Sequence, residues 1–119
     1  MNNHNHQREC VKLITAARES GTAHHKTRYI LVVLRSQGIQ YPSEYYHKVC
    51  PDIRAAIESV AEANRIDPFR IFSMLYALPA VTPESVRKNL GDDASDALVQ
   101  AWFAVLTAAI EALEPVVFI

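Results

Sequence analysis

The chain has 119 residues, which is enough for one domain with an apolar core and too few for two ordinary domains. Half of the residues are hydrophobic, 21% are charged and three are Gly, so the composition excludes a disordered chain and favours helices. The formal net charge is −1, yet residues 1–54 carry eight Lys or Arg against four Asp or Glu, whereas residues 55–119 carry four against nine.

This charge asymmetry fits either a basic face for an acidic partner or two halves of one domain that attract each other. The N-terminus is wholly polar, and we expect residues 1–6 to be flexible. Cys10 and Cys50 lie forty residues apart without a C-x-x-C pattern, which favours reduced thiols in a cytoplasmic protein. The longest apolar run, Ala97 to Ala112, is shorter than the roughly 20 residues of a bilayer span, so we expect no membrane helix.

Two amphipathic helices are predicted before residue 40. The first, Gln7 to Ser20, ends at Gly21, and the second is capped by Thr22 and runs through Gln37 to a stop at Gly38. Six apolar residues at 29–34 also fit a buried strand. We favour a helix there, because the cap, the length and the Gly stop agree and the sequence offers no second strand to pair with it.

Pro residues and N-cap residues divide the rest of the chain. Pro51 ends a short helix, and Asp52, Asp67 and Thr82 each cap a helix that follows. The predicted helices run from Ser43 to Cys50, Asp52 to Arg65, Pro68 to Leu78, Pro83 to Leu90, where Gly91 closes the helix, and Asp93 to Glu114.

The last predicted helix is apolar around most of its circumference, which indicates a central helix or one shared with a partner. Pro115 is expected to stop it, leaving an apolar tail over residues 115–119 that docks on the body or on another chain. We therefore predict an all-α fold for residues 1–119. It is a single compact orthogonal bundle of five to seven helices with a central C-terminal helix, on which the first two helices pack.

The stretch from Val60 to Leu75 has the apolar spacing of two short helices joined by a tight turn. Asp67 caps the second helix, and the apolar positions are filled by Val60, Ala61, Ile66, Ile71, Met74 and Leu75. Over about these sixteen residues the segment resembles helix–turn–helix DNA-binding proteins of the repressor type. The resemblance implies a DNA-binding regulator that uses residues 60–76 and lays its second helix in the major groove.

In that reading the basic residues of the first half and of the second helix contact the nucleic acid. The candidate nucleic-acid contacts are Arg8, Lys12, Arg28, Arg35 and Arg70. Arg65 stands in the turn, where such proteins favour Gly. The outward positions of the second helix are expected to be Pro68, Phe69, Phe72, Ser73 and Tyr76, whereas base edges are read mainly by Arg, Lys, Asn and Gln.

The spacing of potential ligands and nucleophiles predicts neither a metal site nor an enzyme. The histidines are His4, His6, His24, His25 and His47, and they form no H-x-x-x-H pair, nor do the cysteines form a C-x-x-C pair. Cys50 lies three residues from His47 at a helix end, where the helix dipole disfavours a thiolate. Three Gly provide no phosphate loop. We therefore expect no catalytic residues, metal or cofactor.

The favoured function is a small non-enzymatic interaction or regulatory module. We expect it to self-associate through the apolar last helix, the tail over residues 115–119, or both, so that its partner is a second copy of the chain or another protein. Exposed aromatic and apolar residues are typical of such contacts. Tyr45 and Tyr46 are consecutive on a helix, so they are not expected to face inward together. The candidate protein contacts are Tyr45, Tyr46, Phe69, Phe72, Tyr76, Val116, Val117, Phe118 and Ile119.

Overall fold

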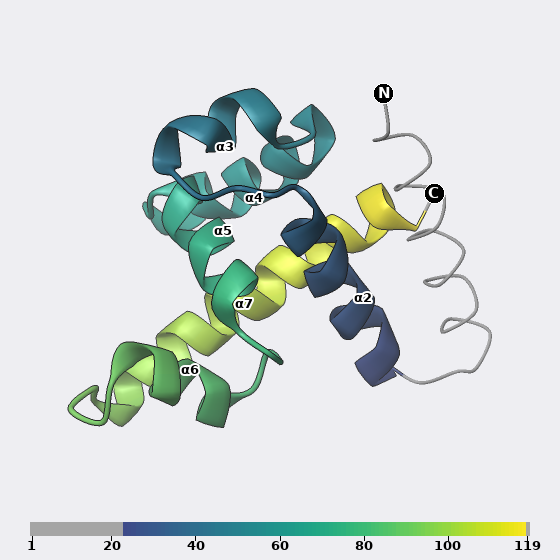
Figure 1. Cartoon of the computed structure of the whole chain (residues 1–119). Coiled ribbons are helices and arrows are strands. Elements are labelled where there is room, and N and C mark those ends of the chain that lie inside the picture. The colour runs from purple at the N-terminus through teal and green to yellow at the C-terminus, as the bar shows by residue number, and fades with distance from the viewer. Residues whose placement is uncertain (1–22, 119) are drawn as a thin grey trace.

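The computed structural model describes residues 23–118, which form helices joined by short connections. In chain order these helices are α2 (Ala23–Ser36), α3 (Pro42–Lys48), α4 (Pro51–Asn64), α5 (Pro68–Ala77), α6 (Pro83–Leu90) and α7 (Asp96–Val117). They pack into one bundle around a common apolar core (Figure 1). The predicted all-α fold is confirmed.

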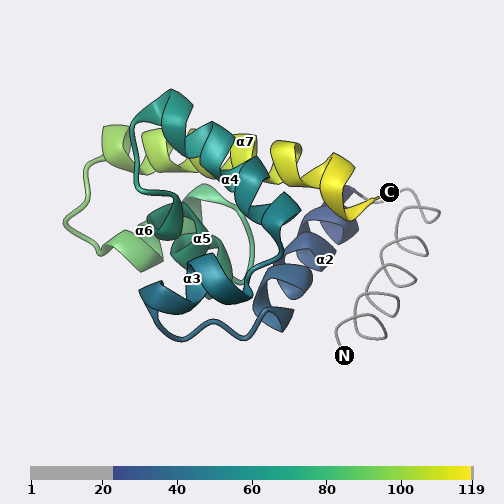
Figure 2. The same ribbon diagram turned by 90° about the horizontal axis from the view of Figure 1, so that it is seen from above.

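The last helix is central to this bundle, as predicted. Helix α7 packs most extensively against α4 and also contacts α2, α5 and α6. Figure 2 shows α4 running alongside α7, with α6 near the N-terminal end of α7 and α2 near its C-terminal end. Two ion pairs tie these ends, one from Lys26 to Glu114 at 3.2 Å and one between Arg87 and Asp96.

The apolar run at 29–34 lies inside α2, which confirms the helix and rules out the strand for this segment. Ile30, Leu31 and Leu34 are fully buried, and Val33 is nearly so. A helix places these residues on one broad side, which packs against α5 and α7. Helix α2 ends at Ser36, and Gly38 follows with φ 67°, a left-handed conformation that suits Gly.

The predicted starts of α3 and α4 are wrong. Helix α4 begins at Pro51 with Cys50 at the N-cap position, so Asp52 lies in the first turn and does not cap the helix. Helix α3 likewise begins at Pro42. In both cases Pro occupies the first helical position, because its fixed φ suits a helix and its missing N–H costs nothing there. The Asp67 and Thr82 caps are confirmed, since each side chain accepts a backbone N–H.

The boundaries of the last helix also differ from the prediction. Helix α7 begins at Asp96, and the Ser95 hydroxyl accepts the N–H of Leu98. The helix continues through Pro115 to Val117, so the predicted stop is wrong. Pro in the last turn removes a single intrahelical hydrogen bond, and burial of the Val117 side chain favours continuation.

Several predictions fall outside the described residues. These are the helix from Gln7 to Ser20, the Thr22 cap, the flexibility of residues 1–6, and the contacts assigned to Arg8, Lys12 and Ile119.

Candidate functional site

The connection between α4 and α5 is short and closely bonded. Arg65 adopts a left-handed conformation with φ 55° and ψ 45°, and the N–H of Ile66 donates to the Ala61 carbonyl at 2.9 Å. A left-handed conformation is unfavourable for a residue with a Cβ, which is why Gly is common at such helix ends. Arg65 thus takes the conformation for which Gly is usually selected. The chain then enters α5 at Asp67, whose carboxylate accepts the N–H of Phe69 at 2.9 Å.

The exposed side of α5 is not the aromatic one that was predicted, although Ser73 is exposed as expected. Phe72 is buried in the core, and Phe69 and Tyr76 are half-buried against it. The reason is nonlocal: the ring of Tyr45 in α3 lies edge-on to Phe72, with ring centroids 5.2 Å apart. The exposed residues of α5 are Arg70, Ser73 and Ala77.

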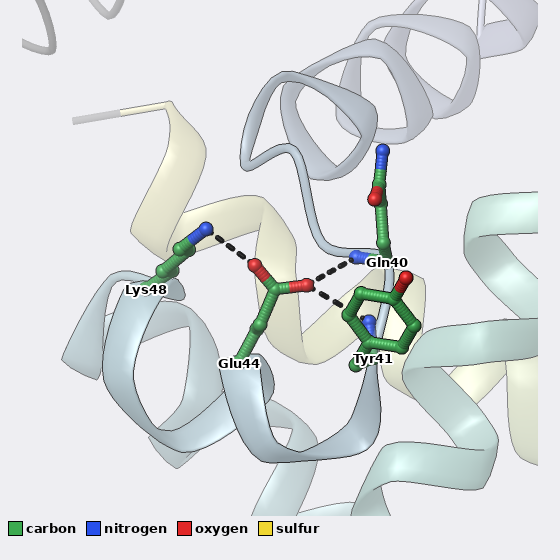
Figure 3. A network of polar contacts seen from close by, with 4 residues as sticks. All are labelled: Gln40, Tyr41, Glu44 and Lys48. Atoms are coloured by element: carbon green, nitrogen blue, oxygen red, sulfur yellow. Dashed lines mark hydrogen bonds and ion pairs between the residues drawn. The ribbon is translucent and has the colours of Figure 1, made fainter.

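A polar network at the start of α3 positions the aromatic residue that follows it. The Oε1 atom of Glu44 accepts the backbone N–H groups of Gln40 and Tyr41, each at 2.9 Å, and its Oε2 atom accepts from Lys48 (Figure 3). The hydrogen bond from Lys48 is the main cause that lowers the pKa of Glu44, and the backbone donors add to it. The network fixes the first turn of α3, and Tyr45 follows directly.

Tyr45 and Tyr46 are consecutive on α3, and their rings meet edge to face with centroids 5.0 Å apart, yet they differ in burial. Tyr46 is 50% exposed, whereas Tyr45 is fully buried, so Tyr45 is a core residue and not a surface contact. Among the described residues, the hydroxyl of Tyr45 and the Nε of Arg54 are buried side-chain atoms with no hydrogen-bond partner. Burial is the main cause that raises the pKa of Tyr45.

The candidate nucleic-acid contacts in the described part of the chain differ in exposure and in the groups that they contact. Arg28 is exposed on α2. Arg35 is half-buried and donates to the carbonyls of Tyr76 and Leu78 at the end of α5, so it is used inside the fold. The guanidinium of Arg70 lies 5.1 Å from the centre of the Trp102 ring.

The described part of the apolar tail packs on its own chain. Val117 is 6% exposed, and Val116 and Phe118 are half-buried against the core. The N–H of Phe118 donates to the Glu114 carbonyl at 2.9 Å. Of the predicted contacts in this tail, Val117 is therefore a core residue.

One side of α7 faces away from the core of the described residues, although Ala108 on this side packs partly against that core. The buried side carries Trp102, which is 7% exposed, together with Leu106, Ala109 and Leu113. The opposite side is lined by small residues and two longer polar ones that are exposed or half-buried. We call this side the alanine face, and it consists of Ala97, Gln100, Ala101, Ala104, Thr107, Ala108 and Glu111.

The sequence pointed to the last helix as a surface for self-association, but it did not show that these residues are the exposed ones. A helix turns about 100° per residue, and on that basis these seven positions share one side of α7. The signal was therefore present as a run of Ala at helical spacing. It was obscured because Leu, Val, Phe and Ile cover much of the remaining circumference.

Comparison with known proteins assigns no family. No protein-family model matches the chain, and no similar curated protein or solved structure was found.

Two further features of the described residues concern a membrane span and a metal site. Helix α7 is long and apolar enough to cross a membrane by length and composition, a test that core helices of soluble proteins also pass. Of its most apolar stretch, 28% is buried within the fold. Within residues 23–118, three or more His, Cys, Asp or Glu side chains are nowhere grouped so as to hold a metal ion.

Proposed function

We propose that the protein is a small non-enzymatic interaction module that associates with a second copy of itself through the alanine face of α7. The observation that carries this proposal is that the most apolar helix of the fold keeps one side exposed, at Ala97, Ala101 and Ala104. Exposed apolar helix faces are typical of protein interfaces, because covering them removes apolar surface from water.

The composition of the face suits a helix from another chain. Ala97, Ala101 and Ala104 are exposed, and each presents a single methyl group. Small side chains let two helix axes approach closely, and the separation of packed helices depends on the residues at the contact. Such residues also lose no side-chain conformational entropy on burial. Cytoplasmic location remains a prediction and is part of this proposal.

The aromatic residues that were predicted as protein contacts give less support to an interaction surface for self-association. Tyr45 and Phe72 are core residues, which leaves Tyr46 and the half-buried Phe69 and Tyr76 as remaining aromatic candidates. They lie on α3 and α5, whereas the alanine face belongs to α7. We therefore assign self-association to α7 and not to the aromatic cluster.

Analytical ultracentrifugation over a concentration series tests the proposal. We expect a mass above one chain that rises with concentration, and its loss in Ala104→Arg, because a long charged side chain prevents close packing of the face. The matched control is Ala63→Arg on the exposed side of α4, which should behave like the unchanged protein. A single-chain mass at the highest soluble concentration would reject self-association.

A DNA-binding regulator is the second candidate, and the left-handed Arg65 between α4 and α5 favours it. This residue supplies the tight turn that a helix–turn–helix needs without Gly. Binding to random duplex at two salt concentrations tests this reading, with Arg28→Ala and Arg70→Ala as contact variants. Arg35 is left unchanged, because it bonds to the end of α5. No binding at low salt would exclude the DNA function.

A further inference from the structure

Three aromatic side chains meet where α3 and α5 come together. The rings of Tyr46 and Phe69 both lie edge-on to the ring of Tyr45, with centroids 5.0 and 5.8 Å away and interplanar angles of 86° and 74°. Tyr45 is fully buried, whereas Tyr46 is 50% exposed and Phe69 is half-buried. A core residue therefore supports two rings that reach the surface.

Two exposed carboxylates lie beside these rings. The carboxylate of Asp67 accepts the backbone N–H of Phe69 at 2.9 Å, which places it at the base of that side chain. Burial is the largest cause that raises the pKa of Tyr45, and the charges of Glu58 and Asp67 add to it. Such an effect weakens with distance, so Glu58 in α4 also lies near the three rings.

The negative charge of these carboxylates is not balanced within the described residues. The ion pairs among residues 23–118 include neither Glu58 nor Asp67. Arg54 is half-buried and acts on Tyr45 in the opposite direction, but it forms no ion pair with either carboxylate. Two carboxylates beside one guanidinium leave an excess of negative charge, which suits a cationic ligand.

A buried polar group points to a ligand at the same place. The hydroxyl of Tyr45 is buried and has no hydrogen-bond partner among residues 23–118. A hydroxyl oxygen can accept hydrogen bonds, and a buried polar group without a partner costs free energy. A ligand that carries N–H donors would therefore suit the hydroxyl as well as the two carboxylates.

We propose that this surface binds an arginine side chain of another protein. We call it the arginine site, and it consists of Tyr46, Glu58, Asp67 and Phe69. The guanidinium plane stacks on the exposed ring of Tyr46, and its N–H groups donate to the carboxylates. The proposal goes beyond self-association, because it adds a second surface to which α7 contributes no residue.

The combination of rings and carboxylates favours arginine over other partners. A guanidinium is planar, carries five N–H donors and is weakly hydrated, so it can stack on a ring and bond to a carboxylate at once. The chain already has one such stack, in which Arg70 lies 5.1 Å from the centre of the Trp102 ring. An apolar partner would instead cover Glu58 and Asp67 without a counter-charge, which is unfavourable.

Amide NMR titration with the peptide acetyl-Gly-Arg-Gly-amide tests the site. The control peptide carries citrulline, a neutral analogue of arginine with nearly the same shape. We expect saturable shifts at Tyr46, Asp67 and Phe69 with the arginine peptide and much smaller ones with the citrulline peptide. Equal shifts with both peptides would overturn the proposal. Shifts confined to the acidic residues at 92–96 would also overturn it, because they would show attraction to negative charge in general.

Variants of the carboxylates give a second readout through the dissociation constant of the arginine peptide. Asp67→Asn removes the charge and keeps the helix cap, since Asn also caps helices. Asp67→Asn and Glu58→Gln should each weaken binding about two- to fivefold. The matched control is Glu62→Gln, at an exposed carboxylate of α4 one turn later, which should leave binding unchanged. Equal losses in Glu58→Gln and Glu62→Gln would overturn the site.

The aromatic contribution is tested in the same way. Tyr46→Ala should weaken binding of the arginine peptide about two- to fivefold, because the stacked ring is lost. Tyr41→Ala removes a ring that is 63% exposed and should have no effect. Thermal unfolding of Tyr46→Ala separates a loss of binding from a loss of fold, and the two carboxylate variants decide the question if this variant unfolds. Unchanged binding in a folded Tyr46→Ala would overturn the proposal.

Discussion

The guanidinium of Arg35 in α2 donates from Nε to the backbone carbonyl of Tyr76 in the last turn of α5, over 3.1 Å. A second hydrogen bond runs from the same side chain to the Leu78 carbonyl, which lies at the C-cap of α5. The last carbonyls of a helix have no partner within the helix. Arg35 therefore caps α5 from a helix forty-one residues earlier in the chain.

Arg35→Ala should destabilise the fold by about 1–3 kcal/mol, because two half-buried carbonyls lose a charged donor. Urea unfolding measures the loss. The stability of Arg35→Lys should lie between that of the unchanged protein and that of Arg35→Ala, because an ammonium group lacks the planar fork that reaches both carbonyls. The matched control is Arg28→Ala, which alters an exposed residue of the same helix and should change stability by less than about 0.5 kcal/mol. Equal losses for both Ala variants would contradict the capping role.

Tyr45→Phe should leave stability unchanged or raise it by about 1 kcal/mol at neutral pH. The buried hydroxyl has no hydrogen-bond partner among the described residues, so removing it relieves a desolvation cost and retains the packing of the ring. Tyr46→Phe, at a half-exposed ring, is the control and should be neutral. A loss of more than about 1 kcal/mol in Tyr45→Phe would show that the hydroxyl is satisfied in solution.

The same residue should make the fold sensitive to alkali. Burial raises the pKa of Tyr45 above its ordinary value of 10, so the folded chain keeps a proton that the unfolded chain releases. Below pH 10 both states are protonated, and Tyr45 contributes no pH dependence. Stability should therefore fall as the pH rises above 10, and Tyr45→Phe should lose part of that decline. If the stability of the unchanged protein and that of Tyr45→Phe fall in parallel above pH 10, Tyr45 is not a cause of the decline.

The network at the start of α3 lowers the pKa of Glu44, so the stability of the fold should depend on pH in the acid range. The stability that this carboxylate supplies is present above its unfolded pKa near 4.5 and is lost as the pH falls through the lower folded pKa. Lys48→Met should raise the pKa of Glu44, because the largest cause of the shift is removed. The backbone donors of Gln40 and Tyr41 remain, so the pKa should stay below 4.5. Carbon NMR titration of the Glu44 carboxyl group measures this pKa. An unshifted pKa in the unchanged protein would refute the network.

Pro115→Ala should stabilise the end of α7. Ala at this position restores an N–H that donates to the Glu111 carbonyl, and Pro costs up to ~3 kcal/mol relative to Ala in a helix interior. Pro79→Ala, in the connection after α5, is the control and should give no gain. In the unchanged protein the Phe118 amide should exchange slowly, because it donates to Glu114. Exchange at the rate of an unstructured peptide would indicate that the helix ends at Pro115.

Local signals in the sequence determined most of the helices. Asp67 and Thr82 cap α5 and α6 as predicted, and Gly38 and Gly91 follow the ends of α2 and α6. These signals act over a few residues, because a cap satisfies backbone groups within one turn and Gly relieves strain at its own position. The run at 29–34 is a helix for the same reason, since its flanking signals agree.

Tertiary packing decided which side of each helix is buried. Phe72 was expected outside and lies inside, because the distant Tyr45 packs against it. Arg35 is a helix cap and not a free cation, because α2 passes the end of α5. Continuation of α7 past Pro115 depends on a core that accepts Val117.

The alanine face also depends partly on the local sequence and partly on tertiary packing. The sequence alone established that α7 is apolar on nearly all sides, because that property depends on composition and helical period. It did not establish which side stays exposed, because that depends on where α2, α4, α5 and α6 pack. Burial is a property of contacts between segments far apart in the chain, so the three-dimensional arrangement was needed to reveal the face that we propose as the interface.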